Sequence, residues 1–317
     1  MDEFLLLKQR LPGVQRSVSL KKHTTFRIGG PAKYFFVAKT SQDIEKAVKV
    51  ARILKLPLFL LSGGSNILVS DNGFPGLVIK IRNSKFEIRN LSVWAEAGVQ
   101  VSTLVSETGK QGLAGLEWAG GLPGTVGGAV RGNAGAFRGE TKDCVESVEA
   151  LDQRGKRRIF SKHQCKFAYR SSVFKEKNSI VLAATFKLHK ENKKEIQAIA
   201  KDHIRYRKER HPLTYPNAGS IFKNCDLKKV PKKLHKGLKD VIKIDPFPVV
   251  PTAYLIAQAG LKGLRQGDAQ VSEKHPNYIV NIGNARAQDV LKLIAKVKKR
   301  IKKHFRIDLE EEITFPH

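Results

Sequence analysis

The sequence is short of acidic residues, of cysteine and of long apolar runs, and each shortage excludes a class of protein. Three cysteines, Cys144, Cys165 and Cys225, stand far apart among 317 residues, so we expect neither a disulfide framework nor a metal site. No apolar run approaches the ~20 residues that span a bilayer. The acidic start, Asp2-Glu3, also argues against a secretory signal peptide. These features predict a protein of the reducing cytoplasm with no membrane partner.

The scarcity of acidic residues leaves a large positive charge. There are 58 Lys and Arg against 29 Asp and Glu, which gives a formal net charge of +29. Such a field attracts polyanions, so a basic nucleic-acid-binding protein is one alternative. However, the basic run 292–306 lies on a pattern of apolar residues at helical spacing, as in an ordinary surface helix. Neither this run nor 228–243 alternates basic with aromatic residues to stack bases, and we expect no specific nucleic acid partner.

The pattern of apolar residues predicts an α+β fold. Strands are expected at 34–38, 58–61 and 77–81, and a helix from 44 to 54 begins with the capping pair Thr40 and Asp43. Further strands are expected within 144–188, then helices at 195–210, near 252–259 and at 288–304. We interpret 213–226 as a loop and 311–315 as a final strand.

Two glycine-rich segments are candidates for binding a nucleotide. Ser62-Gly63-Gly64-Ser65-Asn66 directly follows a predicted strand, where successive backbone N–H groups can hold phosphate oxygens. It is neither a Walker loop nor a Rossmann fingerprint, and alone it could be a simple tight turn. Residues 112–139 hold ten of the 26 glycines, interrupted by apolar residues. Two such segments in one α/β region favour an extended dinucleotide cradled by backbone.

Several motifs, in order along the chain, carry a resemblance to a known family. They are Thr24 to Ala32, Gly63-Gly64-Ser65-Asn66, Gly115 to Ala136, Tyr169-Arg170-Ser171-Ser172, Asn217 to Asn224, Gly260 to Gly263, Val271 to His275 and Leu309-Glu310-Glu311-Glu312-Ile313. This ordered set resembles the UDP-N-acetylenolpyruvoylglucosamine reductases (MurB), of the type with shorter loops. The sequence departs from their pattern at Ser62, Cys225 and Asp268 and in the long basic segment 226–251.

The resemblance implies a fold, a cofactor and a reaction. The fold is a two-subdomain FAD-binding region of the vanillyl-alcohol-oxidase (PCMH) type, followed by a separate α+β substrate-binding domain. We expect boundaries of 1–85, 86–210 and 211–317. The reaction, in peptidoglycan precursor synthesis, moves a hydride from NADPH to FAD and on to the enolpyruvyl group of UDP-N-acetylglucosamine-enolpyruvate, giving UDP-N-acetylmuramate. We expect these small-molecule partners and a monomer.

Three residues would carry the chemistry by this resemblance. Negative charge that develops beside a carboxylate needs stabilisation, which is usually the largest catalytic contribution. Arg170 would hold the substrate carboxylate with its forked guanidinium. Ser220 would protonate the carbanion, and Glu312 would donate to the carboxylate or hold the geometry. The family spacing after Leu309 selects Glu312 over Glu310 and Glu311. Without the motifs, Arg170 and Glu312 resemble surface residues and Ser220 a turn residue.

The resemblance also implies binding residues. Those expected to bind the cofactor are Gly63, Gly64, Ser65, Asn66, Gly121, Pro123, Gly124, Thr125, Gly127, Gly128, Asn133 and Ala134. Those expected to bind the substrate are Tyr169, Lys223, Asn224 and His275, although a surface role for His275 is an equal alternative. The remaining enzymatic alternative is another FAD-dependent oxidoreductase of the same fold. The sequence has no flavin-attaching histidine at the glycine loop, which disfavours some members of that wider group.

Overall fold

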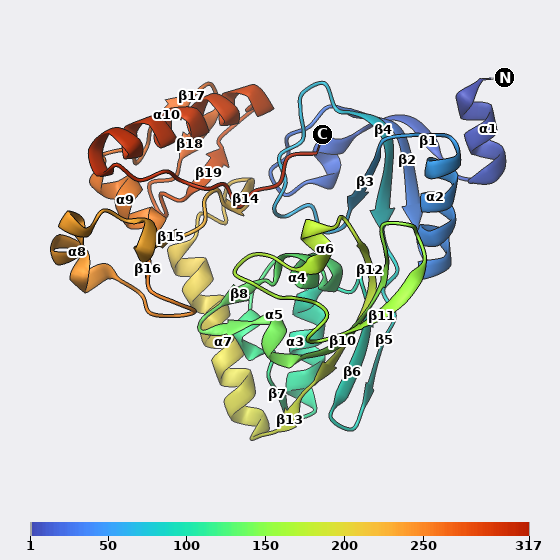
Figure 1. The fold of residues 1–317 in the computed structure, drawn as a ribbon, viewed down its shortest axis with the longest axis horizontal. Helices are drawn as coiled ribbons and strands as arrows, with labels where there is room; N and C mark the ends of the chain where they lie inside the picture. Colours follow the sequence, from blue (N-terminus) through green and yellow to red (C-terminus); the bar gives the residue numbers. More distant parts are fainter. Residues whose placement is uncertain (1, 317) are drawn as a thin grey trace. The chain divides into compact units, whose positions relative to one another are not determined.

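The computed structural model describes residues 2–316, which form two compact units (Figure 1). Unit 1 consists of the residues up to Val18, Ala32–Gly63 and Phe74–Arg207. Unit 2 consists of Ser19–Pro31, Gly64–Gly73 and the residues from Lys208 onward. Each unit has a hydrophobic core of its own. The three-domain division expected from the sequence is a different partition and stays a prediction.

The first sheet of unit 1 is built around parallel strands. Its order is β1 (Gln15–Ser19), β2 (Pro31–Ala38), β4 (Phe74–Ile81) and β3 (Leu58–Leu61), with β2 and β3 both parallel to β4. The helix between β2 and β3 is α2 (Ser41–Ile53), which packs against β4. The predicted capping box of Thr40 and Asp43 is confirmed, as is the strand at 58–61.

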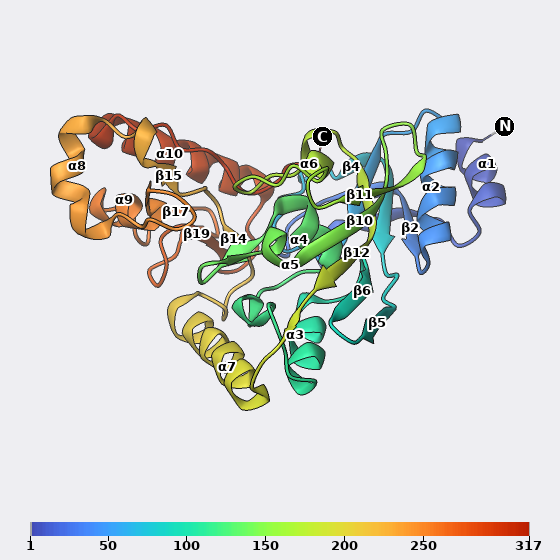
Figure 2. The same ribbon diagram turned by 60° about the horizontal axis from the view of Figure 1, so that its bottom comes forward.

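The second sheet of unit 1 is antiparallel and shares the same core. Its order is β11 (Arg157–Ser161), β10 (Val145–Leu151), β12 (Ile180–Lys187), β6 (Ser92–Glu96) and β5 (Phe86–Arg89). Helix α4 (Val126–Gly132) packs against β12 and β6, as Figure 2 shows. The remaining elements are α1 (Glu3–Arg10), α3 (Val101–Lys110), β7 (Leu113–Ala114), η2 (Glu117–Ala119), β8 (Gly135–Ala136), β9 (Gly139–Glu140), α5 (Thr141–Cys144), α6 (Val173–Glu176), β13 (His189–Lys190) and α7 (Lys193–Arg210).

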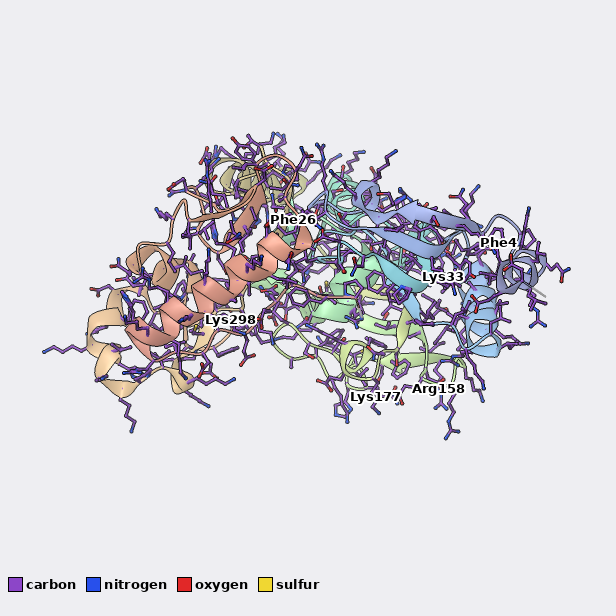
Figure 3. The ribbon with its side chains drawn as sticks, turned by 90° about the horizontal axis from the view of Figure 1, so that it is seen from above. Phe4, Phe26, Lys33, Arg158, Lys177 and Lys298 are labelled. Carbon is purple, nitrogen blue, oxygen red and sulfur yellow. The ribbon has the colours of Figure 1, made fainter. Side chains whose placement is uncertain are left out.

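Unit 2 is a small antiparallel sheet with helices. The sheet order is β14 (Asn217–Ser220), β19 (Tyr278–Asn281), β18 (Ala269–Val271) and β17 (Arg265–Gln266). Helix α10 (Ala287–Phe305) packs its apolar face against β17 and β18, and Figure 3 labels Lys298 on this helix. The other elements are η1 (Leu20–His23), β15 (Cys225–Asp226), η3 (Leu227–Lys229), α8 (Lys232–Leu238), η4 (Lys239–Val241), β16 (Val249–Val250) and α9 (Thr252–Gln258).

Two predicted elements in unit 2 differ from the structure. The loop expected at 213–226 contains the strands β14 and β15, because Asn217-Ala218-Gly219-Ser220 gains its partners from β19 rather than from its own pattern. The final strand expected at 311–315 is wrong as well: Glu311 and Thr314 form isolated bridges only. Within residues 2–316, no helix is long and apolar enough to cross a membrane, and no three metal-ligating side chains gather.

Candidate functional site

In unit 1 the two glycine-rich segments meet. Gly63 follows β3 and lies against Gly124, so closely that a Cβ on Gly63 would stand 2.9 Å from the Gly124 Cα. The Ser62 and Thr125 hydroxyl groups hydrogen-bond to each other across this junction. Gly121 and Gly124 have positive φ angles of 70° and 112°, which side chains disfavour. The backbone of two predicted cofactor segments is therefore brought together without intervening side chains.

Helix α4 contains two glycines, Gly128 and Gly132, that neither packing nor backbone conformation within the described chain explains. Gly127 has a packing reason, because an added Cβ would lie 2.8 Å from the Ala97 Cβ. Gly128 would meet only the Thr125 Oγ1 at 3.9 Å, and Gly132 would meet nothing within 4 Å in the described part of the chain. Neither residue has a positive φ. Gly128 and Gly132 are four residues apart, on one helix face. A bare face of this kind fits the close approach of a flat ring or a dinucleotide.

The turn after α4 is stabilised by hydrogen bonds of the buried Asn133 side chain. Asn133 is fully buried in a left-handed conformation, and its amide donates to the Glu140 carboxylate at 3.2 Å and the Ala168 carbonyl at 3.0 Å. Its Oδ1 accepts from the Lys142 N–H at 3.0 Å. The Ala134 N–H donates to the Ala129 carbonyl. These two predicted cofactor residues thus shape the turn, and their direct contact with a cofactor stays a prediction.

Arg170 lies in unit 1, where its own backbone is strained. Its φ is +55°, a conformation uncommon for residues other than glycine. Its guanidinium donates to the Gly135 carbonyl at 3.0 Å and lies 4.9 Å from the centre of the Tyr169 ring. Lys175 donates to the Arg170 carbonyl at 3.0 Å. The side chain is half-buried and anchored at the edge of the turn that follows α4.

In unit 2 a hydrogen-bonded strip of backbone brings Ser220 beside the C-terminal glutamates. Ser220 ends β14 and pairs with Tyr278. The Glu312 N–H donates to the Ile221 carbonyl at 2.8 Å, and Phe222 forms a bridge with Glu311. Sequence reasoning selected Ser220 and Glu312 from segments about ninety residues apart. The structure places the two segments side by side.

The two glutamates before Glu312, Glu310 and Glu311, form ion pairs with lysines. Glu310 pairs with Lys229 at 2.5 Å and with Lys223 at 3.4 Å, and the hydrogen bond from Lys229 holds the pKa of the Glu310 carboxyl below its usual value. Glu311 pairs with Lys298 at 2.7 Å. Glu310 and Glu311 therefore both form ion pairs with lysines, and the role of Glu312 stays a prediction.

The second half of the first glycine loop belongs to the same assembly in unit 2. The Gly64 carbonyl accepts from the Thr25 N–H at 3.0 Å, within another of the quoted motifs. Asn66 donates from its amide to the Glu312 carbonyl at 3.2 Å, and its own carbonyl accepts from the Thr314 N–H at 3.0 Å. Ser65 lies between these two anchored residues. Three separate predicted motifs, 64–66, 219–222 and 310–312, are thus joined by direct hydrogen bonds.

The predicted substrate residues in unit 2 have mixed surroundings. Asn224 accepts from the Thr252 N–H at 3.3 Å through its side chain, which ties it to the start of α9. His275 is half-buried against Tyr278, with ring centres 4.9 Å apart, and its Nδ1 is buried with no hydrogen-bond partner among residues 2–316. Burial lowers the pKa of His275, which favours the neutral ring. A neutral imidazole nitrogen without a partner suits a hydrogen bond with a ligand.

Two site residues escaped the sequence reasoning. Asn277 is buried, and its side chain accepts from the Phe222 N–H at 3.1 Å and donates to the Phe222 carbonyl at 2.8 Å, clamping the segment after Ser220. Lys80 is the second: it lies in β4, only 6% exposed, and donates to the Ser62 carbonyl. The only sequence signal for Lys80 was a single charge within the apolar strand Leu77 to Ile81.

Comparisons with known proteins match one family model in the N-terminal part of the chain and another in the C-terminal part. Residues 32–161 match the family model of an FAD binding domain, and residues 211–316 match that of the UDP-N-acetylenolpyruvoylglucosamine reductase C-terminal domain. The reductase of Syntrophomonas wolfei is 38% identical over 296 residues, which cover 93% of this chain and 92% of that protein. The reductase of Caldanaerobacter subterraneus is 39% identical, with 93% and 90% covered.

A solved structure gives the same result. The crystal structure of UDP-N-acetylenolpyruvylglucosamine reductase (MurB) from Thermus caldophilus superimposes with a TM-score of 0.75 at 34% identity. The superposition covers 95% of this chain and 98% of that one. The likeness therefore extends over nearly the whole length of both proteins.

Proposed function

This chain belongs to the UDP-N-acetylenolpyruvoylglucosamine reductase family, with an FAD-binding domain followed by the family's C-terminal domain, and we propose that it reduces UDP-N-acetylglucosamine-enolpyruvate to UDP-N-acetylmuramate with NADPH as electron donor. The observation that carries the proposal is the assembly in unit 2 of Asn66, Ser220 and Glu312, each from a different motif. As the resemblance implies, we assign the reaction to peptidoglycan precursor synthesis in the cytoplasm.

The bare face of α4 and the meeting of the two glycine segments fit the binding of FAD. When bound, FAD would supply the hydride for reduction of the double bond, with NADPH as the source of its electrons. The residues expected to hold it include Gly63, Thr125 and Gly128, through backbone that side chains leave open. Close backbone contact of this kind suits a cofactor with both a flat ring and phosphates.

The chain's own residues then manage charge and protons on the substrate. When hydride adds to the terminal vinyl carbon, negative charge appears on the carbon next to the carboxylate and spreads into it. Arg170 binds the carboxylate, because a guanidinium is permanently charged and can contact two oxygens. The Ser220 hydroxyl gives its proton to the charged carbon, which completes the saturation of the double bond. The Glu312 carboxyl O–H donates a hydrogen bond to the same carboxylate, or the side chain holds the geometry of the site.

A spectrophotometric titration tests the proposal. The purified protein should be yellow, and NADPH should bleach the flavin absorbance in the absence of oxygen. Addition of UDP-N-acetylglucosamine-enolpyruvate should restore the absorbance, with UDP-N-acetylmuramate as product. A flavoprotein that NADPH bleaches but this substrate does not reoxidise would point to another oxidoreductase of the same fold. A colourless protein whose DNA affinity falls steeply with salt would favour the nucleic-acid alternative.

A further inference from the structure

Lys80 is a buried cation at the point where the two glycine segments of unit 1 meet. It is the second-last residue of β4, opposite Leu61, and Ser62 follows directly after Leu61. Ligands of parallel α/β sheets bind beyond the carboxyl ends of the strands, and Lys80 stands at that end. Its Nζ donates to the Ser62 carbonyl at 2.5 Å, and Ser62 in turn bonds to Thr125.

The described part of the chain places no opposite charge beside this ammonium group. Lys80 is only 6% exposed, and no carboxylate within residues 2–316 forms an ion pair with it. The charged side chain that acts on it is Arg82, of the same sign. Burial lowers the pKa of Lys80 to about 8, with a smaller contribution from Arg82. A buried charge without a partner is costly, and an ammonium has three donors, of which the Ser62 carbonyl takes one.

An apolar residue would serve the fold better at this position. The neighbours Leu77, Val78, Ile79 and Ile81 are all buried and apolar, as expected for a strand covered on both faces. A methionine would fill a similar volume without the cost of desolvating a charge. The charge of Lys80 therefore requires a negative partner that the described chain does not supply. An anion bound beside the Ser62–Gly63 backbone would be such a partner.

We infer that Lys80 binds the phosphate groups of the dinucleotide cofactor, as the cation beneath the backbone cradle formed by Ser62, Gly63 and Thr125. This inference rests on the proposed flavoenzyme function and adds a residue that motif comparison did not select. Lysine is well suited to the role, because it acts as a compact point charge on phosphate oxygens. The Ser62 carbonyl orients the ammonium group, and the cofactor provides the missing negative charge.

The test compares flavins with and without phosphates. The full-length protein is stripped of flavin, and FAD and riboflavin are titrated into the wild type, Lys80→Met and Lys80→Gln. Lys187→Met, at the exposed end of β12, is the matched control. We expect both Lys80 variants to bind FAD at least about tenfold more weakly, the effect of one lost phosphate contact, with riboflavin affinity unchanged. Lys187→Met should bind both flavins as the wild type does.

A second readout separates phosphate binding from a structural role. Without flavin, Lys80→Met should unfold at a higher temperature than the wild type, because it removes a buried charge. A purely structural lysine would give the opposite result. The inference is overturned if Lys80→Met or Lys80→Gln binds FAD like the wild type, or if riboflavin affinity falls equally. A wild type that binds FAD but is not reoxidised by the enolpyruvyl substrate would overturn the proposed function and leave Lys80 standing.

Discussion

Among single residues, Ser220 carries the most specific chemical prediction. Its segment is fixed by the backbone pairing of Ile221 with Glu312 and by the Asn277 clamp on Phe222. Ser220→Ala should therefore keep the fold and the bleaching of flavin by NADPH. Reoxidation by the enolpyruvyl substrate should slow by about 10²-fold or more, the usual contribution of a positioned general acid. Stopped-flow absorbance measures the two half-reactions separately, and Ser102→Ala on the exposed face of α3 is the control. Normal reoxidation would remove Ser220 from this role.

The glutamate triplet offers a second residue-level test. Glu312→Ala removes the carboxyl group proposed to support the substrate carboxylate, so we expect reoxidation to slow by about tenfold or more. Glu311→Ala instead breaks only the half-exposed pair with Lys298, worth about 0–1 kcal/mol. The same stopped-flow measurement should leave Glu311→Ala near the wild type. Equal effects of the two substitutions would contradict the choice of Glu312.

Roles were predicted for individual residues only where a family motif supplied them, and these roles stay predictions. A run of three glutamates gives no physical reason to prefer Glu312 from the sequence alone. The ion pairs of Glu310 with Lys229 and of Glu311 with Lys298 arise only from the tertiary fold. Lys80 shows the opposite case. A lone charge among apolar residues was visible in the sequence, but its depth and its contact with the Ser62 carbonyl depend on the sheet.

At the level of elements, the bare face of α4 carries a prediction about cofactor binding. Gly128→Ala adds a methyl group where the described chain offers no contact closer than 3.9 Å. Alanine favours helix by about 0.5–1 kcal/mol over glycine, so the flavin-free protein should become more stable. FAD affinity should nevertheless fall by about tenfold, equivalent to ~1.4 kcal/mol.

The control for this substitution is Gly237→Ala in α8, where an added Cβ also meets nothing within 4 Å among the described residues. It should stabilise the protein without changing FAD affinity. Thermal unfolding of the flavin-free protein and fluorescence titration with FAD measure the two effects. Unchanged FAD affinity in Gly128→Ala would show that this face of α4 does not contact the cofactor.

The clamp on β14 and its continuation is a second feature at this scale. Asn277→Ala leaves the buried N–H and carbonyl of Phe222 without their side-chain partner. Each such loss costs about 1–3 kcal/mol, so the free energy of unfolding should fall by at least that much. Urea denaturation measures it, with Asn284→Ala at an exposed turn as control. A change below that range would mean that water replaces the amide.

The elements predicted best from the sequence were those with strong local signals. Helix α2 had its capping box and apolar spacing, and β3 was a short apolar run, so both were located correctly. β14 was missed because Asn217-Ala218-Gly219-Ser220 resembles a turn, with Gly219 at a φ of +76°. Its strand character comes from pairing with β19, which is about sixty residues away and leaves no local trace.

At the scale of the whole molecule, contiguous domains were the natural expectation from the sequence, but the units are interleaved. Unit 2 takes in residues 19–31 and 64–73 as well as the chain from Lys208 onward. Phe26 and Leu68 from these short segments are buried in its core, and the Asn281 amide donates to the Phe26 carbonyl at 3.3 Å. The Asp71 carboxylate accepts from the Ala287 N–H at the start of α10. Such long-range pairings leave no periodic signal in the segments concerned.

The net charge of +29 belongs to the molecule as a whole, and its expected effect is on encounter with anionic substrates. The proposed substrates carry phosphates, and a cationic field raises the rate of association with them by 10-fold or more at low salt. Salt screens this field, since the Debye length falls from about 30 Å at 0.01 M to about 8 Å at 0.15 M. We therefore expect kcat/KM for NADPH to fall by about tenfold over this range, while kcat stays nearly constant.

Steady-state kinetics at graded NaCl concentrations measure this dependence, and a triple variant locates its source. Lys232, Lys233 and Lys236 lie on α8, a short helix within the basic segment 226–251. Replacing all three with Gln removes three of the positive charges and should lower kcat/KM at low salt only, because at high salt their field is already screened. A flat salt dependence in the wild type would mean that the charge does not guide NADPH. An unchanged variant beside a salt-dependent wild type would place the guiding charge elsewhere on the surface.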